Sequence, residues 1–221
     1  MIDLLHVSTG FRQDGHRVEV LSDLTARFDG SADVGILGGN GSGKSTLLRV
    51  LAGMIKPDRG VVRRSVRVSP PLSHTGGFHP NLSGRDNARF IARLHGADPA
   101  AVIRFARDFS EIGPHFDRPI TTYSNSMKAR VAYALSMAVP FDMLLVDEVT
   151  AVGDVSFKRK CLEAFAERRR NASVIMVSQA VTSIARICSV GAILENGRLT
   201  AFPSMTDAVR SYETNLTVLH G

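Results

Sequence analysis

The sequence has only two cysteines, no long hydrophobic run and no internal repeat. Cys161 and Cys188 show neither paired nor metal-type spacing, so we expect two buried, reduced thiols. No apolar stretch approaches the roughly 20 residues that span a bilayer. Residues 1–6 also lack the basic start and apolar core of a signal peptide. Together these absences predict a protein that is made and kept in the cytosol.

The charge balance is basic, but it does not identify a partner. A net charge of +6 is compatible with binding to nucleic acid, with an anionic membrane face or simply with solubility. Arginines are scattered along the chain, and only residues 168–170 form a run. That run falls at the expected end of a helix, where positive charge interacts favourably with the helix dipole.

Hydrophobic patterning predicts strands and helices that alternate along most of the chain. Short strands are expected at 2–7 and 18–21, joined by a polar, glycine-containing loop at 10–16. Further strands are expected at 34–37, 61–62, 66–68, 143–146, 174–177, 192–195 and 198–202, and helices at 44–52, 84–94, 98–110, 126–139, 154–169, 181–187 and 204–214. Asn196-Gly197 is a strong signal for a hairpin between the last two strands.

This order of elements predicts a parallel α/β core with a helical insertion. The 221 residues have room for one sizeable α/β domain, or for one domain with a small subdomain. We expect a single domain over residues 1–221, with a core at about 1–70 and 140–221 and a helical subdomain at about 71–139.

Residues 38–45 match the phosphate-loop pattern G-x-x-x-x-G-K-[ST] without a mismatch. Its glycines let successive backbone N–H groups point into one concavity, where the next helix begins. The lysine then reaches the β- and γ-phosphates, and the following hydroxyl ligates Mg²⁺. We expect ATP contacts from Gly38, Asn40, Gly41, Ser42, Gly43, Lys44, Ser45 and Thr46, with Mg²⁺ on Ser45. The alternative, a glycine-rich turn without a ligand, arises by chance in on the order of one chain per hundred.

A second motif consists of four apolar residues followed by two acids, at 143–148. A buried parallel strand needs such an apolar run, and ligands bind at the carboxyl ends of these strands. Asp147 is expected to hold Mg²⁺, and Glu148 to polarise the attacking water. Apolar strands that end in acids are common, so this motif gains its meaning from the phosphate loop upstream.

Two further stretches resemble loops of the ABC ATPases. Residues 148–154 have the length and end residues of the D-loop of that family, and residues 123–127 sit where its signature loop belongs. The resemblance covers nearly the whole chain. It implies an α/β, P-loop ABC-type ATPase domain with a parallel-sheet core, an antiparallel β subdomain and a helical insertion.

The resemblance also implies roles for individual residues. Ser124, Ser126 and Asp154 occupy positions that contact nucleotide from the signature loop and the D-loop. Phe11 resembles the aromatic residue that stacks on adenine, although a lone phenylalanine is equally often part of a core.

Within this family, several stretches are similar to the ATPase subunits of bacterial capsular polysaccharide exporters. These stretches are residues 76–78, 82–90, 127–130 and 147–154. Exporters of O-antigen and teichoic acid share part of the pattern. Many of the O-antigen type carry an extra C-terminal carbohydrate-binding domain, whereas this sequence stops soon after its last expected helix. We therefore expect the capsule type, with the O-antigen or teichoic-acid type as the alternative.

The mechanism of the family implies two kinds of partner. A head-to-tail dimer would enclose two ATP molecules, each between the phosphate loop of one subunit and the signature loop of the other. The dimer would dock on separate membrane permease subunits at the cytoplasmic face of the bacterial inner membrane. A homodimer is expected, with a heterodimer as the alternative. Family members that act on ribosomes or DNA usually carry two ATPase domains or a long coiled-coil insertion, and neither fits in 221 residues, so no nucleic-acid partner is expected.

Three positions depart from the family pattern. His79 stands where the subgroup has a glutamine, and Gln179 stands where the family has its switch histidine. Ser126 replaces the second glycine of the signature, after Asn125 in place of the first. Gln179 can donate a hydrogen bond but cannot carry a proton, and protonated His79 would repel Mg²⁺. Ser126 could donate its hydroxyl or crowd the γ-phosphate, and it would be strained if its φ had to be positive.

These departures leave the hydrolysis rate open. The identities at 79 and 179 are exchanged relative to the family, which suggests either mutual compensation or independent drift. Slow hydrolysis, or a regulatory switch that hardly hydrolyses, is the alternative to a transport ATPase. The presence of Glu148 argues against a pure switch, because such a protein needs no activated water.

Overall fold

The computed structural model describes residues 1–13, 16–72, 78–147 and 153–219. The chain forms two compact units. The first, here called the sheet unit, comprises Met1–Pro71, Asp142–Val149 and Ala172–Gly221. The second, the helical unit, comprises Leu72–Phe141 and Thr150–Asn171. In the described ranges no helix is both long and apolar enough to cross a membrane.

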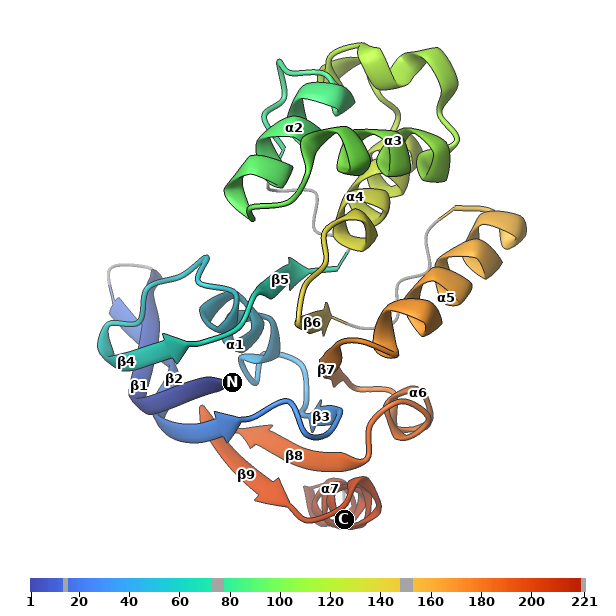
Figure 1. Cartoon of the computed structure of the whole chain (residues 1–221). Coiled ribbons are helices and arrows are strands. Elements are labelled where there is room, and N and C mark those ends of the chain that lie inside the picture. The colour runs from blue at the N-terminus through green and yellow to red at the C-terminus, as the bar shows by residue number, and fades with distance from the viewer. Residues whose placement is uncertain (14–15, 73–77, 148–152, 220–221) are drawn as a thin grey trace. The chain divides into compact units, whose positions relative to one another are not determined.

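A six-stranded sheet forms the centre of the sheet unit (Figure 1). Its neighbouring strands pair in parallel except for the last two, which form an antiparallel hairpin. The hairpin turns at Asn196 and Gly197, whose φ angles of 50° and 73° suit this turn type. In spatial order the strands are β5 (Val68–Pro71), β6 (Met143–Asp147), β7 (Ser173–Ser178), β3 (Val34–Leu37), β8 (Val190–Glu195) and β9 (Arg198–Phe202).

A second, antiparallel sheet has the order β2-β1-β4. Its strands are β1 (Ile2–Gln13), β2 (His16–Phe28) and β4 (Arg59–Arg64). The expected loop at 10–16 is wrong, because β1 and β2 continue to pair as far as Gln13 opposite His16. Gly10 suggested a loop, but it lies inside the ladder, where an added Cβ would come within 2.6 Å of the Val18 carbonyl oxygen. Close approach of two strands therefore explains this glycine.

Helices of the sheet unit pack against its strands. Helix α1 (Lys44–Leu51) buries Leu47, Leu48, Val50 and Leu51 in one core with apolar residues of both sheets. Each such side chain contributes about 1.5–3 kcal/mol relative to its exposed state. Helices α6 (Val181–Ala185) and α7 (Met205–Leu219) pack near Gly35 of β3, where a Cβ would come within 2.8 Å of Ile184 and Met205.

The helical unit contains α2 (Gly84–Leu94), α3 (Pro99–Ser110), α4 (Asn125–Ala138) and α5 (Val155–Arg169), with short 3-10 turns at Gly113–Asp117 and Ile120–Thr122 (Figure 1). The side chain that precedes each helix caps it by accepting a backbone N–H; the caps are Ser83, Asp98, Ser124 and Asp154. The predicted starts of α2 and α3, at Ser83 and Asp98, are confirmed.

Helix α5 groups with the helical unit, although its sequence position suggested the core. The Tyr133 hydroxyl on α4 donates to the Cys161 carbonyl on α5 at 2.8 Å, and Arg168 Nε donates to the Met137 carbonyl at 2.7 Å. The division of the chain at residues 71 and 139 stays a prediction. Cys161 and Cys188 are both buried, as expected.

Candidate active site

The phosphate-loop residues 38–45 connect β3 to α1 within the sheet unit. Strand β7 lies next to β3, with Ser178 opposite Leu37, and β6 lies next to β7, with Asp147 opposite Val177. All three strands run in the same direction, so their carboxyl ends share one edge of the sheet. The loop, Asp147 and Gln179 therefore come together at that edge.

The backbone of the loop depends on its glycines. Gly41 and Gly43 have φ angles of 76° and 98°, a region that favours glycine. Gly38 has an ordinary φ but no room: an added Cβ would lie 2.5 Å from the Leu194 carbonyl oxygen and 2.6 Å from Ser42 Oγ. The same conformation leaves the first N–H groups of α1 without a side-chain cap, since Gly43 occupies the cap position. These groups form a ready site for an anion.

Lys44 is held at this loop by the loop itself. Its side chain is buried, and Nζ donates to the carbonyl oxygens of Gly38 and Gly39, both at 2.7 Å. Ser42 Oγ is one of two buried side-chain oxygens in the described ranges that lack a hydrogen-bond partner. A buried hydroxyl without a partner is costly, and a phosphate oxygen bound at this loop could satisfy it. The residues present therefore fit the phosphates of a nucleotide.

The predicted magnesium residues occupy suitable positions. Ser45 is exposed in the first turn of α1, and Asp147 is half-buried at the end of β6. Hydroxyl and carboxylate oxygens are ligands that Mg²⁺ accepts, usually together with phosphates and water. Thr46 follows Ser45 and is half-buried. Glu148, the predicted water-activating residue, lies outside the described residues.

Gln179 contacts the phosphate loop directly, which the sequence did not predict. Its Nε2 donates to Oδ1 of Asn40 at 2.5 Å. The backbone behind it is fixed, since the buried Ser178 accepts the Ala180 N–H at its hydroxyl, at 2.9 Å. The side chains of Asn40, which follows β3, and Gln179, which follows β7, thus meet at the edge of the sheet where these strands end.

Phe11 is exposed on the β1-β2 ladder, where it lies opposite Val18. Val20 is two residues further along β2, at an irregularity of the ladder between Glu19 and Leu21. A Cβ on Gly43 would come within 2.9 Å of the Val20 side chain. Strand β2, the partner of the strand that carries Phe11, therefore borders the phosphate loop. The stacking role of Phe11 stays a prediction.

The remaining predicted residues belong to the helical unit. Ser124 caps α4, with its Oγ accepting the Met127 N–H at 3.2 Å. Ser126 is exposed in the first turn of α4 and is not among the non-glycine residues with positive φ. The strain considered for Ser126 is therefore absent from this conformation. Tyr123, just before this turn, is anchored by donating to the Phe116 carbonyl and accepting the Gly84 N–H, both at 3.1 Å.

Asp154 has a structural role that its motif did not reveal. One carboxylate oxygen accepts the Phe157 N–H at 3.0 Å, which caps α5, and the other accepts from Arg130 on α4 at 2.8 Å. The first of these bonds, followed by the charge of Arg130, holds the pKa of Asp154 below its ordinary value. Arg130 also lies 4.2 Å from the centre of the Phe157 ring. Asp154 thus joins α4, which carries the signature residues, to the start of α5.

His79 is exposed, and the segment around it is held by Asn87. The buried Asn87 side chain accepts the His79 N–H at 2.8 Å and donates to the carbonyls of His79 and Ser83, at 3.3 and 2.9 Å. Asn87 lies in the stretch 82–90 that resembles the exporter subgroup, but the sequence predicted no role for it. An asparagine in the first turns of a helix that follows a loop is the sequence signal that would have suggested one, because its side chain can bond to the backbone of that loop.

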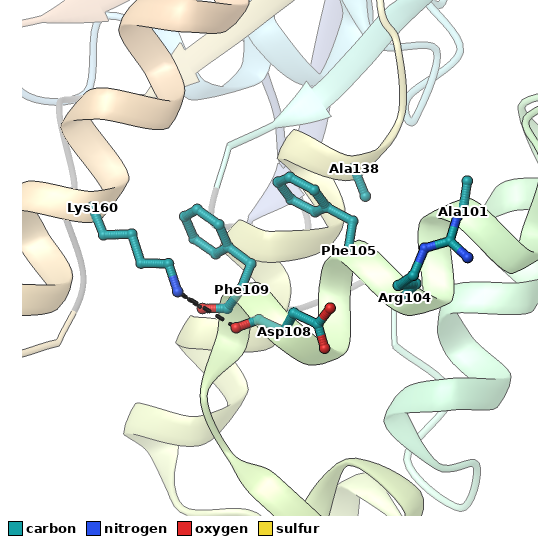
Figure 2. Close-up of a pocket in the computed structure, with 7 residues that line it drawn as sticks. All are labelled: Ala101, Arg104, Phe105, Asp108, Phe109, Ala138 and Lys160. Carbon is teal, nitrogen blue, oxygen red and sulfur yellow. Dashed lines mark hydrogen bonds between the residues drawn. The ribbon is translucent and has the colours of Figure 1, made fainter.

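The helical unit also has a hollow of its own, of about 580 Å³ (Figure 2). Phe105 and Phe109 stack beside it with ring centres 5.3 Å apart, and Lys160 donates to the carbonyls of Phe109 and Asp108, at 3.0 and 3.4 Å. Lys160 also pairs with Glu111 at 2.7 Å. None of the predicted site residues lines this hollow.

Comparisons with known proteins agree with this geometry. A family model described as ABC transporter matches residues 21–151. ATP-binding protein BexA of Haemophilus influenzae is 41% identical, over 94% of this chain and 93% of its own length. The capsule polysaccharide export ATP-binding protein CtrD of Neisseria meningitidis serogroup B is 40% identical, over 97% and 99% of the two chains.

More distant relatives include O-antigen export ATP-binding proteins. One of these, RfbB of Klebsiella pneumoniae, is 36% identical over 90% of this chain and 82% of its own length. Among solved structures, a dimeric post-hydrolysis state of the ATP-binding cassette MJ0796 with ADP and phosphate superposes with a TM-score of 0.73. It covers 93% of this chain and 99% of its own, at 16% identity, and so supports the fold alone. The expected fold class is confirmed.

Proposed function

The chain belongs to the ABC transporter family, and we propose that it is the ATP-hydrolysing subunit of an exporter of capsular or related cell-surface polysaccharide. The observation that carries the ATPase assignment is the phosphate loop, with Lys44 held on two loop carbonyls and an unsatisfied Ser42 hydroxyl. Two relatives are about 40% identical to this chain over almost their whole length. One of them is named a capsule polysaccharide export ATP-binding protein, and this name supports the transport assignment.

Each residue of the site then has a chemical task. The loop N–H groups and Lys44 bind the phosphates, and Ser45 and Asp147 hold Mg²⁺, which when bound neutralises charge on the β- and γ-phosphates. Glu148 orients the attacking water and accepts its proton. Gln179 donates to the γ-phosphate, and Phe11 stacks on the base. His79 takes the position of the subgroup's glutamine, and its task is to sense the water and the metal.

A dimer completes this mechanism. Ser124 and Ser126 would contact the nucleotide of the partner subunit, and Asp154 would position the partner-facing loop. Closure of the dimer would be transmitted to permease subunits at the cytoplasmic face of the inner membrane. We propose a homodimer, so both sites carry the three departures at 79, 126 and 179, and hydrolysis is slower than is usual for this family.

Phosphate release by the purified full chain tests the enzyme assignment. Glu148→Gln should lower kcat by about 100-fold or more, because it removes the base that activates water. Lys44→Ala should abolish turnover by removing the main cation at the phosphates. Lys56→Ala is a matched control, since Lys56 is an exposed lysine outside the loop. Equal rates for the wild type and Glu148→Gln would defeat the assignment.

The transport assignment needs a test in cells. Loss of the gene should remove polysaccharide from the cell surface while polymer accumulates inside. The wild-type gene should restore it, and the Glu148→Gln gene should not. Normal surface polysaccharide in the deletion strain would show that this ATPase powers a different process.

A further inference from the structure

The contact between Gln179 and Asn40 joins two segments of the active-site edge. Asn40 lies three residues after β3, and Gln179 is the first residue after the neighbouring strand β7. Both side chains are exposed, and Gln179 Nε2 donates a hydrogen bond to Asn40 Oδ1. The pair therefore lies on the surface where a nucleotide held by the loop would place its phosphates.

A free glutamine side chain would be poorly suited to this place. It has several rotatable bonds, and ordering it costs on the order of 1.5–2 kcal/mol of conformational entropy. The backbone is restrained at both places: the Ala180 N–H bonds to the Ser178 hydroxyl, and the Ser42 N–H donates to the Gly39 carbonyl at 3.3 Å, which closes a turn around Asn40. The Asn40 oxygen adds the missing restraint on the end of the Gln179 side chain.

The hydrogen bond to Asn40 also orients the carboxamide group of Gln179. A carboxamide has two N–H donors on one nitrogen, in a fixed plane. The Asn40 oxygen engages one of them and thereby orients the other. We propose that Asn40 is a positioning residue, which holds Gln179 so that its second N–H donates to the terminal phosphate of bound ATP. This inference rests on the proposed function, since it requires ATP at the loop.

The inference predicts a selective defect. ADP lacks the terminal phosphate, so loss of the pair should weaken ATP binding and leave ADP binding unchanged. A residue that merely shapes the loop would affect both nucleotides. The ratio of the two dissociation constants is therefore the quantity that separates positioning from a structural role.

The experiment uses the full chain with Mg²⁺ and either ATP or ADP. Equilibrium dissociation constants are measured in a Glu148→Gln background, and kcat is measured with Glu148 intact. The variants are Asn40→Ala, Gln179→Ala and the double variant, with Asn215→Ala on α7 as a matched exposed asparagine. Thermal unfolding checks that all four remain folded.

We expect Gln179→Ala to lower the preference for ATP over ADP, and kcat, by about tenfold, the range for a hydrogen bond to a charged group. Asn40→Ala should lower both by a smaller factor in the same direction. The double variant should be no worse than Gln179→Ala, because the Asn40 side chain acts only through Gln179, and the backbone N–H of residue 40 that faces the nucleotide is kept in Asn40→Ala. Asn215→Ala should match the wild type.

Three results would overturn the inference: an unchanged ATP preference in Asn40→Ala, a double variant whose loss is the product of the single losses, or an equal loss of ADP binding. Failure of the proposed function is recognised separately. If the wild type binds ATP but releases no phosphate, the dissociation constants still test the pair. If the wild type hydrolyses ATP while Asn40→Ala keeps its preference, only the pairing is lost.

Discussion

Gly38 is the residue of the phosphate loop with the least space around it. Changing Gly38 to alanine places a Cβ 2.5 Å from the backbone oxygen of Leu194, which cannot move without disturbing β8. We expect a loss of about 1–3 kcal/mol in the free energy of unfolding, as in other overpacked sites. Nucleotide affinity should fall as well, because relief of the clash displaces the loop.

Gly39→Ala is the control for this change. The neighbouring glycine has nothing within 4 Å of an added Cβ, and its φ is not in the left-handed region. Its stability should stay near that of the wild type. Urea unfolding and ADP titration of the two variants would measure the difference, and equal stability would contradict the packing argument.

The sequence predicted local motifs but not the contacts between side chains that lie far apart in the chain. The sequence predicted the roles of Lys44 and Ser45 because the loop motif is local and its chemistry follows from spacing. It could not predict that Gln179 bonds to Asn40, 139 residues away, or that Asn87 holds His79. Such contacts arise from strand order and turn geometry, which leave no periodic signal in the chain.

At the scale of elements, the Arg130–Asp154 ion pair links α4 to α5, and it should show in the pH dependence of stability. The folded-state pKa of Asp154 is lowered, so its contribution is fully present above the ordinary pKa of about 4. The contribution is lost as the pH falls through the lowered folded-state value. Asp154→Asn should therefore reduce the urea midpoint by a constant amount between about pH 5 and pH 8, because this whole range lies above the ordinary pKa of aspartate.

Below about pH 4 the difference between wild type and Asp154→Asn should shrink, because the wild-type carboxylate also becomes neutral. Asp207→Asn is a control, since Asp207 contacts Ser204 and forms no ion pair in the described ranges. A difference that persists at low pH would mean that the substitution acts through the helix cap alone.

Elements with strong local signals were predicted well, and those that depend on pairing were not. The caps at Ser83 and Asp98 and the hairpin at Asn196-Gly197 follow from residues close in sequence. The length of β1 and β2 does not, because polar residues near Gly10 become strand only when the partner strand satisfies their backbone groups. The grouping of α5 likewise depends on contacts with α4 that no helical pattern reports.

At the scale of the whole molecule, the exchanged identities at 79 and 179 lie in different units. If they compensate one another, His79→Gln and Gln179→His should each lower the ATPase rate, and the double exchange should recover it. The interaction free energy in the cycle should then exceed about 0.5 kcal/mol. Purely additive changes in kcat would show that the two positions drifted independently.

In the proposed head-to-tail dimer, each active site combines the phosphate loop of one copy with the signature residues of the other copy. Lys44→Ala disables the phosphate loop, and Ser126→Trp should block the exposed start of α4 without disturbing the fold. Neither homodimer should hydrolyse ATP. A mixed dimer, however, places both defects in one composite site and leaves the other intact.

Mixing the two variants in equal amounts should therefore restore roughly a quarter of the wild-type rate, because half of randomly assorted dimers are mixed and each has one working site. Adding more of either variant alone should restore nothing, which serves as the control. The phosphate-release assay detects this gain against a zero background. If mixing gives no recovery while both variants remain folded, Ser126 does not serve the partner's nucleotide, and the head-to-tail arrangement fails for this chain.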